Sequence, residues 1–588
     1  MTQPGMKRLF ASVSAVIAAV AMGAAGVATA AAVEGAPKVD LQITNAQGRT
    51  FVAMRVGNYT RVIASPSDPK TGSVAVQTVD DPSTVKSASA AAVTSVLNSR
   101  GETVPAEATN DPIAYVSTNW GLGNDGATTT TEGGKPQYDG NVRLFLNAIW
   151  QNAGFKSLFD EPGLDTAVAD ANGVATFSGL VQGEYIVVDK TPGTNIDKTL
   201  PMFVSTLAKT SASAADALTI PGTTGSIEAK SSTPAKPVKT NDKNDYSVGD
   251  TVRFTITDKV PSYIAYNADT YKFIVHDTLS KGLKFSGAGT VTVKVGATVL
   301  QPYDASTNKN GYVFQAVAPG GESGSLDFDL SHFFSELIKA HDGSVAGQTI
   351  EINYETTLTS SAIDMKPGEI HNDANVEYSN DPDTEATGKT DQGRSTVYTF
   401  DFDVVTLDKA SRAPITGAEY TVTRHGESTP MNLVKVSEGI YRPESATDTR
   451  TATESTLTVG GDGKIVIKGV ASGSYDVKET KAPAGYMNLQ PLFTAGITAT
   501  YKTVDDDRVL DTLLYSITSD KYGLSDLLDK DAGHYRVFNV KNLTQLPLTG
   551  AAGIMFLVTV GVLLVAAGSC IYLLSVRNAK KESGAVRV

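Results

Sequence analysis

The sequence predicts a mainly β protein made of three tandem immunoglobulin-like β-sandwich domains. Short segments in which polar and apolar residues alternate recur along the chain, and Gly, Asp, Asn or Pro residues bound each of them. The length of 588 residues exceeds that of one domain, and a hydrophobic fraction of 41% is typical of folded proteins.

The alternation is clearest in four segments that we expect to be strands, namely 251–257, 291–295, 350–354 and 464–470. Three segments with helical spacing are expected to pack against sheet edges, namely 90–97, 141–153 and 331–340. Residues 98–140 are expected to be irregular.

Two polar stretches divide the chain. Residues 222–240 are rich in Gly, Ser, Thr and Pro, and residues 379–397 are polar up to the start of a new apolar strand. We therefore expect an N-terminal domain at 33–225, a linker at 226–240, a middle domain at 236–396 and a C-terminal domain at 397–543.

A weak internal repeat links the first and third domains. The segment GVATFSGLVQGEYIVVDKT (173–191) is similar to GKIVIKGVASGSYDVKETKAP (463–483). Both are expected to form a strand, a glycine turn and a second strand, which indicates a shared supersecondary unit. Asp189 then stands at the acidic position of the first copy and Glu479 at that of the second.

Both ends of the chain carry targeting signals. Two basic residues precede an apolar stretch at 9–27, and Ala28-Thr29-Ala30 fits a signal-peptidase site, so residues 1–30 are expected to be a signal peptide. Residues 551–576 carry no charge and are long enough to form a transmembrane helix. The tail at 577–588 is basic and is expected in the cytoplasm, which places everything between the two signals outside the cell.

Composition excludes several kinds of function. A net charge of -13 argues against nucleic acid as a partner. The single cysteine, Cys570, lies in the C-terminal apolar run, so no disulfide forms within the chain. The six histidines are scattered, and we expect no metal and no cofactor. The sequence has no Ser/His/Asp constellation and no phosphate-binding loop, so an enzyme is not expected.

One acidic residue is predicted to point into a domain core. On a strand, Tyr475, Val477 and Glu479 share a face, and the first two mark that face as apolar. A buried carboxylate is costly unless it is paired or protonated, so the pKa of Glu479 is expected to rise.

The residues around Glu479 resemble the E-box of Gram-positive surface proteins with collagen-adhesin (Cna) B-type domains, and of sortase-assembled major pilins in particular. FDVVTLDKASRAPITGAEYTV (402–422) and YRVFNVKN (535–542) are similar to the first and last strands of such a domain. YSVGDTVRFTI (246–256), YKFIVHDTLSKGL (271–283) and NDANVEYSNDP (372–382) resemble the Cna A-like middle domain of these pilins. The E-box positions are Tyr475, Glu479, Thr480, Ala482, Pro483, Gly485 and Tyr486.

The resemblance implies an intramolecular Lys–Asn isopeptide bond in the middle domain. Its matching residues are the amine of Lys239, the acid Asp277 and the acceptor Asn380, with Asn372 as the runner-up acceptor. A buried lysine loses its proton and becomes a nucleophile, while a protonated acid polarises the amide. The chain would form this bond in itself once, without enzymatic turnover.

The C-terminal and N-terminal domains depart from this pattern. Glu479 and the acceptor Asn539 are present in the C-terminal domain, but Thr406 stands where the lysine should be, and no lysine occurs between residues 399 and 408. Lys409 is three residues further on and is expected on the opposite face. We therefore expect no isopeptide bond there. For Asp189 in the N-terminal domain, neither a lysine nor an asparagine partner is identified.

The residues Leu546-Pro547-Leu548-Thr549-Gly550 match the sortase sorting motif L-P-x-T-G, directly before the predicted transmembrane helix. A sortase thiol would attack the Thr549 carbonyl and release Gly550, which leaves an acyl-enzyme that awaits an amine. In pilins that amine belongs to a lysine of another subunit. Lys230 occupies the corresponding place after the N-terminal domain, and Lys236 is the runner-up.

The resemblance therefore implies a structural subunit of a cell-wall-anchored fimbria that supports adhesion. Its partners would be a class C-type pilus sortase and a housekeeping sortase, copies of itself, minor tip or base pilins, and peptidoglycan. The alternative is a singly anchored adhesin or minor pilin that binds a host glycan or matrix protein, with a site near residues 98–140, Trp120 and Trp150.

Overall fold

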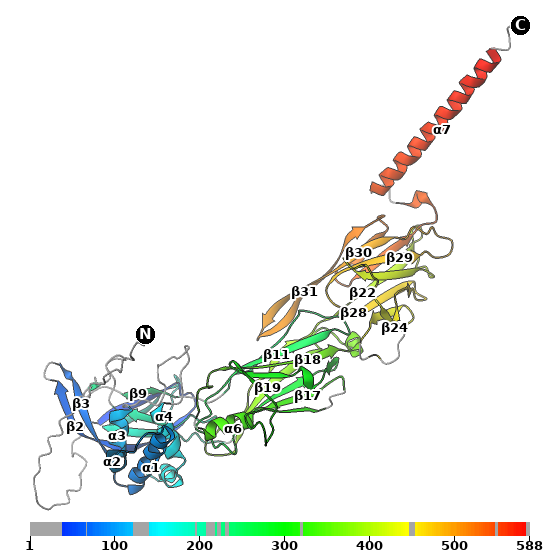
Figure 1. Cartoon of the computed structure of the whole chain (residues 1–588). Helices are drawn as coiled ribbons and strands as arrows, with labels where there is room; N and C mark the ends of the chain where they lie inside the picture. Colours follow the sequence, from blue (N-terminus) through cyan, green and yellow to red (C-terminus); the bar gives the residue numbers. More distant parts are fainter. Residues whose placement is uncertain are drawn as a thin grey trace, which may run out of the picture.

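The computed structural model describes residues 38–583, except 66–67, 121–139, 194–196, 207–217, 220–224, 230–233, 318–320, 341, 446–447, 449–452 and 547–550. The predicted signal peptide, Lys230 and four residues of the sorting motif, Pro547 to Gly550, lie outside the described residues. Three β-rich domains follow one another along an elongated molecule, and a long helix extends from the third domain (Figure 1). The prediction of a mainly β, multidomain fold is confirmed.

The N-terminal domain contains a six-stranded sheet with a different layer on each face. The strand order is β7-β6-β2-β3-β8, with β4 paired to β2, and a separate sheet has the order β5-β1-β9. The strands are β1 (Lys38–Thr44), β2 (Thr50–Ser65), β3 (Asp68–Thr78), β4 (Asp165–Val168), β5 (Ala175–Val181), β6 (Gly183–Asp189), β7 (Met202–Ser205), β8 (Leu218–Thr219) and β9 (Gly225–Glu228).

Helices cover one face of the six-stranded sheet. Ile186 and Val188 of β6 pack against them, whereas Tyr185 and Val187 pack in the core shared with the smaller sheet, so every residue of β6 is buried. The helices are α1 (Ser83–Ser99), α2 (Ala106–Asn110), α3 (Pro112–Asn119), α4 (Asn141–Trp150), α5 (Ala153–Ser157) and the 3₁₀ turn η1 (Leu158–Asp160).

The expectation that residues 98–140 are irregular is wrong for the part that the structure describes. Helices α2 and α3 lie within it, and Ala108, Ile113 and Val116 pack in the same core as α1. Pro105 and Pro112 sit at the starts of these helices, where a missing N–H costs nothing. Both helices are too short for their periodicity to stand out in the sequence.

The middle domain is a sandwich of two six-stranded sheets. One has the order β10-β11-β18-β14-β15 with β13 beside β18, and the other β16-β17-β12-β19-β20 with β21 beside β19. The elements are β10 (Val238–Asn241), β11 (Thr251–Lys259), β12 (Phe273–Leu279), β13 (Leu283–Phe285), β14 (Thr292–Val295), β15 (Thr298–Leu300), β16 (Val313–Val317), β17 (Gly324–Asp329), α6 (Ser331–Lys339), β18 (Thr349–Leu358), β19 (His371–Ser379), β20 (Thr387–Lys389) and β21 (Gly393–Thr396).

The C-terminal domain pairs a seven-stranded sheet, β26-β24-β25-β28-β22-β33-β32, with a five-stranded sheet, β27-β23-β29-β30-β31. Its first and last long strands, β22 and β33, are parallel neighbours. The strands are β22 (Phe400–Asp408), β23 (Glu419–Arg424), β24 (Leu433–Ser437), β25 (Ile440–Pro443), β26 (Thr453–Glu454), β27 (Leu457–Thr458), β28 (Lys464–Val470), β29 (Gly473–Lys481), β30 (Leu492–Val504), β31 (Asp507–Asp520), β32 (Ser525–Asp529) and β33 (His534–Asn539).

The internal repeat is confirmed as a shared strand–turn–strand unit, β5–β6 in the first domain and β28–β29 in the third. In both copies a buried tyrosine hydroxyl reaches back to the carbonyl four residues earlier. Tyr185 donates to Val181 and Tyr475 donates to Ala471, each at 2.7 Å.

The long helix that follows the domains is α7 (Ala551–Ser583). By length and composition, 20 of its residues, Val558–Arg577, could cross a membrane, with a mean hydropathy of 2.1. Side chains in that range are mostly exposed.

Candidate functional site

The predicted lysine of the middle domain is inside the sandwich. Lys239 lies on β10, opposite Ile256 of β11, and is 1% exposed. Its Nζ contacts a carboxyl oxygen of Asp277 on β12 and donates to the Tyr354 hydroxyl on β18 at 2.9 Å. The rings of Phe254 and Tyr354 lie 5.2 Å from Nζ. The amine is therefore held between the two sheets in a site without water access.

Burial sets the protonation of this pair. It lowers the pKa of Lys239 and raises the pKa of Asp277, and the attraction between the two groups opposes both shifts. Because neither side chain is exposed to solvent, we take desolvation as decisive: the neutral amine and the protonated acid are the favoured forms. A neutral lysine amine is a nucleophile.

The amide beside this pair is that of Asn372. Its Nδ2 donates to the Tyr354 hydroxyl, and the nearby amide partly offsets the rise in the pKa of Asp277. Asn372 lies on β19, two residues from Ala374, the residue opposite Asp277, so both side chains occupy the same face. Asn372 is 0% exposed.

Asn380, the preferred acceptor in the sequence comparison, lies elsewhere. It follows the end of β19, six residues past Ala374, which is about 20 Å along an extended strand. Its carbonyl accepts a 2.8 Å hydrogen bond from the backbone of Lys198, so it belongs to the joint with the N-terminal domain. The geometry thus reverses the order of the two candidates and brings the runner-up, Asn372, to the lysine.

The C-terminal domain holds a similar buried group without an amine. Glu479 on β29 is 0% exposed, and its Oε2 accepts hydrogen bonds from Asn539 Nδ2 at 2.9 Å and from the Tyr420 hydroxyl at 3.0 Å. Thr406 on β22 completes the cluster, with its hydroxyl 3.0 Å from that of Tyr420. Burial raises the pKa of Glu479 to about 6, and both hydrogen bonds oppose the rise.

Lys409 does not supply the missing amine. Its Nζ lies 4.5 Å from the centre of the Phe538 ring, in a separate small cluster of apolar side chains beside the main core. Thr406 is fully buried, and its short side chain ends at Tyr420. The described part of this domain therefore places an acid and an amide together, with a hydroxyl where the middle domain has a lysine.

The other E-box residues shape the end of strand β29. Thr480 donates to the Glu419 carbonyl at 3.1 Å, and Tyr486 donates to Asp408 at 2.6 Å. Between them, Ala482 and Pro483 lead into a turn in which Gly485 has φ = +88°, a conformation that favours glycine. The turn fastens the end of β29 to the end of β22.

The buried acidic residues of the N-terminal domain have different partners from those of the other two domains. Asp189, at the position equivalent to Glu479, forms a 2.8 Å ion pair with Arg49 and accepts a 2.9 Å hydrogen bond from the Thr199 backbone. A second buried acid, Glu184, accepts a 3.0 Å hydrogen bond from the Tyr59 hydroxyl. Each of the three domains therefore contains a buried carboxyl group bonded to a tyrosine hydroxyl.

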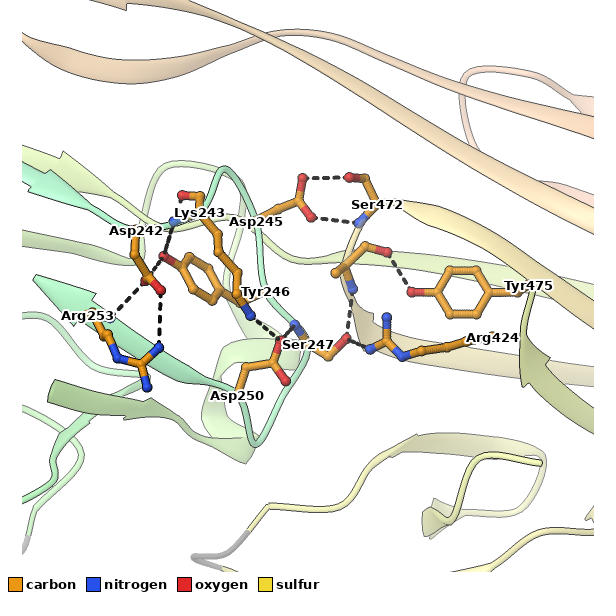
Figure 2. A network of polar contacts seen from close by, with 11 residues as sticks. Asp242, Lys243, Asp245, Tyr246, Ser247, Asp250, Arg253, Arg424, Ser472 and Tyr475 are labelled. Carbon is orange, nitrogen blue, oxygen red and sulfur yellow. Dashed lines mark hydrogen bonds and ion pairs between the residues drawn. The ribbon is translucent and has the colours of Figure 1, made fainter. Parts of the chain in front are cut away.

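Two carboxylates fasten the middle and C-terminal domains to each other. Asp245 accepts hydrogen bonds from the Ser472 backbone and hydroxyl at 2.7 and 2.8 Å (Figure 2), and from the Tyr501 hydroxyl at 2.6 Å. Asp507, at the start of β31, accepts from the Thr396 backbone and hydroxyl at 2.8 and 2.6 Å. The β30–β31 hairpin thus reaches back along the middle domain, as Figure 1 shows.

The centre of this joint is the loop that follows Asp245. Ser247 accepts hydrogen bonds from Arg424 at 2.7 Å and from the Ala471 backbone at 3.0 Å, which links it to both sides of the C-terminal domain (Figure 2). Gly249 has φ = +90°, and a Cβ there would lie 2.2 Å from the Glu444 carbonyl oxygen. The close approach of the two backbones therefore requires glycine at this position.

A smaller polar joint connects the first two domains. Trp150 Nε1 donates to Asp383 at 2.6 Å, and Lys156 pairs with the same carboxylate at 2.8 Å. Trp150 is 3% exposed, and Trp120 packs edge-on against Tyr115 and Phe145. Both tryptophans thus have structural contacts. Within the described residues, no three His, Cys, Asp or Glu side chains are grouped as a metal site would require.

Comparison with known proteins identifies the third domain. Residues 401–509 match the family described as SpaA: Prealbumin-like fold domain. We call residues 401–509 the SpaA-type domain, after the family that this segment matches. A curated relative, the trypsin-resistant surface T6 protein of Streptococcus pyogenes serotype M6, is 26% identical over 302 residues. The match spans 48% of this chain and 48% of the relative, about half the length of each.

Two solved structures align with this chain over long stretches. The T6 backbone pilin of serotype M6 Streptococcus pyogenes aligns over 86% of this chain and 99% of its own, at 16% identity and a TM-score of 0.44. The full-length major pilin SpaD from Corynebacterium diphtheriae aligns over 66% and 87%, at 20% identity and a TM-score of 0.36. The SpaA match and the T6 surface protein agree with the resemblance to Gram-positive surface proteins that the sequence motifs carry.

The sequence patterns did not single out two tyrosines that contact the buried acids. These are Tyr354 in the middle domain and Tyr420 in the SpaA-type domain. A signal was present for the first: alternation along 350–354 places Tyr354 on the inner face with Ile350 and Ile352. A tyrosine hydroxyl in an otherwise aliphatic row must find a polar partner in the core.

Proposed function

We propose that this chain is the major structural subunit of a sortase-polymerised pilus on a Gram-positive cell surface, anchored to peptidoglycan. The observation that carries the proposal is the order of parts at the C-terminal end. A SpaA-type domain (401–509) is followed by LPLTG (546–550) and then directly by a helix that could cross a membrane. That order presents the sorting motif outside the membrane while the helix retains the chain.

Polymerisation would proceed by acyl transfer. A pilus sortase thiol attacks the Thr549 carbonyl, the Thr549–Gly550 bond breaks, and a lysine amine of the next subunit displaces the thiol to form an amide. Housekeeping sortase would transfer the last subunit to a peptidoglycan amine. Minor tip or base pilins would join through the same chemistry.

Lys230 is the proposed acceptor amine. The runner-up, Lys236, donates to the Asp505 carbonyl at 3.0 Å and lies 3.4 Å from an Asp506 carboxylate oxygen, at the tip of the β30–β31 hairpin. A lysine side chain held by these two contacts is less available to attack an acyl-enzyme than an unengaged one. This contact favours Lys230.

We propose further that the middle domain closes an isopeptide bond between Lys239 and Asn372. Nζ of Lys239 attacks Cγ of Asn372, the Nζ–Cγ bond forms, the Cγ–Nδ2 bond breaks, and ammonia leaves. Asp277 gives its proton to the amide oxygen, takes the proton that Nζ loses and passes one to the leaving group, and it recovers its own proton from the amide oxygen as the new amide forms. The support is the burial of all three groups, the contact of Lys239 with Asp277, and the Tyr354 hydroxyl that both Lys239 and Asn372 contact.

Immunoblots of wall extracts test the pilus. A ladder of high-mass species is expected for the natural chain, and Lys230→Arg, which keeps the charge, should abolish it. Lys236→Arg is the matched control and should leave the ladder intact. A single wall-linked band from the natural chain would instead identify a singly anchored adhesin. A ladder that survives Lys230→Arg would overturn the assignment of that lysine.

A further inference from the structure

The Tyr354 hydroxyl touches every reacting group of the middle-domain site. It lies 2.9 Å from Lys239 Nζ and 2.8 Å from Asp277 Oδ2, and it accepts a hydrogen bond from Asn372 Nδ2. Tyr354 is 1% exposed. Its ring packs against those of Phe254, Phe285 and Phe328, with centroids 5.8, 6.1 and 5.8 Å away, so the hydroxyl is fixed in place.

The contacts define the direction of each hydrogen bond. Burial and the nearby Asp277 hold the pKa of Tyr354 well above its usual value of 10, so the hydroxyl keeps its proton. A phenol has one proton to donate, and Asp277 Oδ2 is the acceptor among its contacts. The phenol oxygen then accepts from Lys239 and from Asn372. The hydroxyl therefore lies between the acid and the nitrogen that must leave.

We propose that Tyr354 is a third catalytic residue of isopeptide formation, which holds the leaving nitrogen of Asn372 and carries a proton to it from Asp277. The inference rests on the proposed Lys239–Asn372 bond. As Nζ attacks Cγ, Asp277 gives its proton to the amide oxygen of Asn372 and takes up the proton that Nζ loses. When the Cγ–Nδ2 bond breaks, Nδ2 takes the phenol proton and leaves as ammonia. Asp277 restores the proton of Tyr354 and recovers its own proton from the amide oxygen. Both groups end as they began, and one ammonia is released.

Two oxygen atoms in the site are available to take part in this proton transfer. Among the described atoms, Oδ1 of Asp277 and Oδ1 of Asn372 are buried without a hydrogen-bond partner. A proton on Asp277 shared with the amide carbonyl would satisfy both oxygens and would polarise the amide toward attack. Asp277 can thus act at the carbonyl through one oxygen while its other oxygen exchanges a proton with Tyr354.

A purely structural role is the competing explanation. The C-terminal domain has the same hydroxyl–acid contact between Tyr420 and Glu479, although Thr406 replaces the lysine there. A tyrosine that only satisfies a buried acid would affect folding stability and leave the rate of bond formation unchanged. The two roles therefore differ in the kinetics of ammonia loss.

Tyr354→Phe tests the proposal because it removes one oxygen and keeps the ring packing. Residues 31–545 are synthesised in a cell-free system, and intact mass is followed with time after folding. We expect ammonia loss in Tyr354→Phe to be slower by roughly 100-fold, within the range of general acid–base catalysis. Tyr312→Phe, at a buried tyrosine of the same domain outside the cluster, should react like the natural chain.

A second variant keeps the test decisive if Tyr354→Phe folds poorly. 3-Fluorotyrosine at position 354 preserves the hydroxyl and its packing but makes the phenol more acidic, so proton delivery should speed up and ammonia loss should be several-fold faster. Equal rates for the natural, Tyr354→Phe and 3-fluorotyrosine chains would overturn the role of Tyr354. Absence of ammonia loss from the natural chain would instead overturn the proposed bond itself.

Discussion

Asn539 donates a 2.9 Å hydrogen bond to Glu479 in the core of the C-terminal domain, where the described residues place a threonine hydroxyl and no amine. The middle domain places a similar acid and amide, Asp277 and Asn372, around a lysine. The two domains thus differ at one decisive position, Lys239 in one and Thr406 in the other.

Thr406→Lys should install a second isopeptide bond. The new amine would enter the same buried cluster, where Glu479 and Asn539 already meet. Intact mass of residues 31–545 should then show the loss of two ammonia molecules where the natural chain loses one. Val405→Lys, on the half-buried outer face of β22, is the matched control and should still lose one. A single loss from Thr406→Lys would contradict the view that only the amine is missing.

Asn372 should be indispensable for the bond of the middle domain. Asn372→Ala is expected to lose no ammonia, whereas Asn380→Ala should lose one, because Asn380 lies beyond the end of the β12–β19 ladder. The bond closes a loop of roughly 130 residues, so its absence should lower the free energy of unfolding by about 5 kcal/mol if the relation for disulfides applies. The opposite pattern in the two variants would restore Asn380 as the acceptor.

The folding stability of the C-terminal domain should depend on pH through the titration of Glu479. Folding raises the pKa of Glu479 from 4.5 to about 6, so the protonated acid is the form that the fold favours. That contribution is complete below pH 4.5 and is lost as pH rises through 6, at a cost of about 2 kcal/mol.

Glu479→Gln stays neutral at every pH and isolates this effect. Its stability relative to the natural chain should increase between pH 4 and pH 8, as read from hydrogen exchange of the core amides of the domain. The exposed Glu427→Gln is the control and should show no such trend. A constant difference between Glu479→Gln and the natural chain would mean that Glu479 does not titrate as its burial implies.

The joint between the middle and C-terminal domains should loosen in Asp245→Ala. Ser472 and Tyr501 would lose a buried acceptor, and each unpaired donor costs about 1–3 kcal/mol. Small-angle scattering should report a broader range of overall dimensions, and exchange should rise at residues 471–474. Asp511→Ala removes an exposed ion pair with Lys502 on the same hairpin and should change neither. An unchanged scattering profile for Asp245→Ala would place the rigidity of the joint in other contacts.

The alternation of polar and apolar residues predicted which face of a strand each side chain occupies. It did not predict which residues of neighbouring strands lie opposite each other. Alternation places Asn372 and Asn380 on the same side of one extended segment, so it could not choose between them. The choice depends on the register of β19 against β12, which sets Ala374 opposite Asp277. Lys239, Asp277 and Thr406 were each predicted from the pattern of a single strand, and the structure places them in the two buried clusters. The short helices at 106–119 were missed because their packing under α1 is a tertiary effect.

The covalent polymer itself is tested most directly by mapping branched peptides from pili released from the wall. Proteolysis followed by tandem mass spectrometry should recover a peptide in which the Thr549 carbonyl is joined to the Lys230 side chain of another subunit. Recovery of Thr549 solely on peptidoglycan amines, with Lys230 unmodified in every peptide, would contradict polymerisation and would identify a singly anchored surface protein.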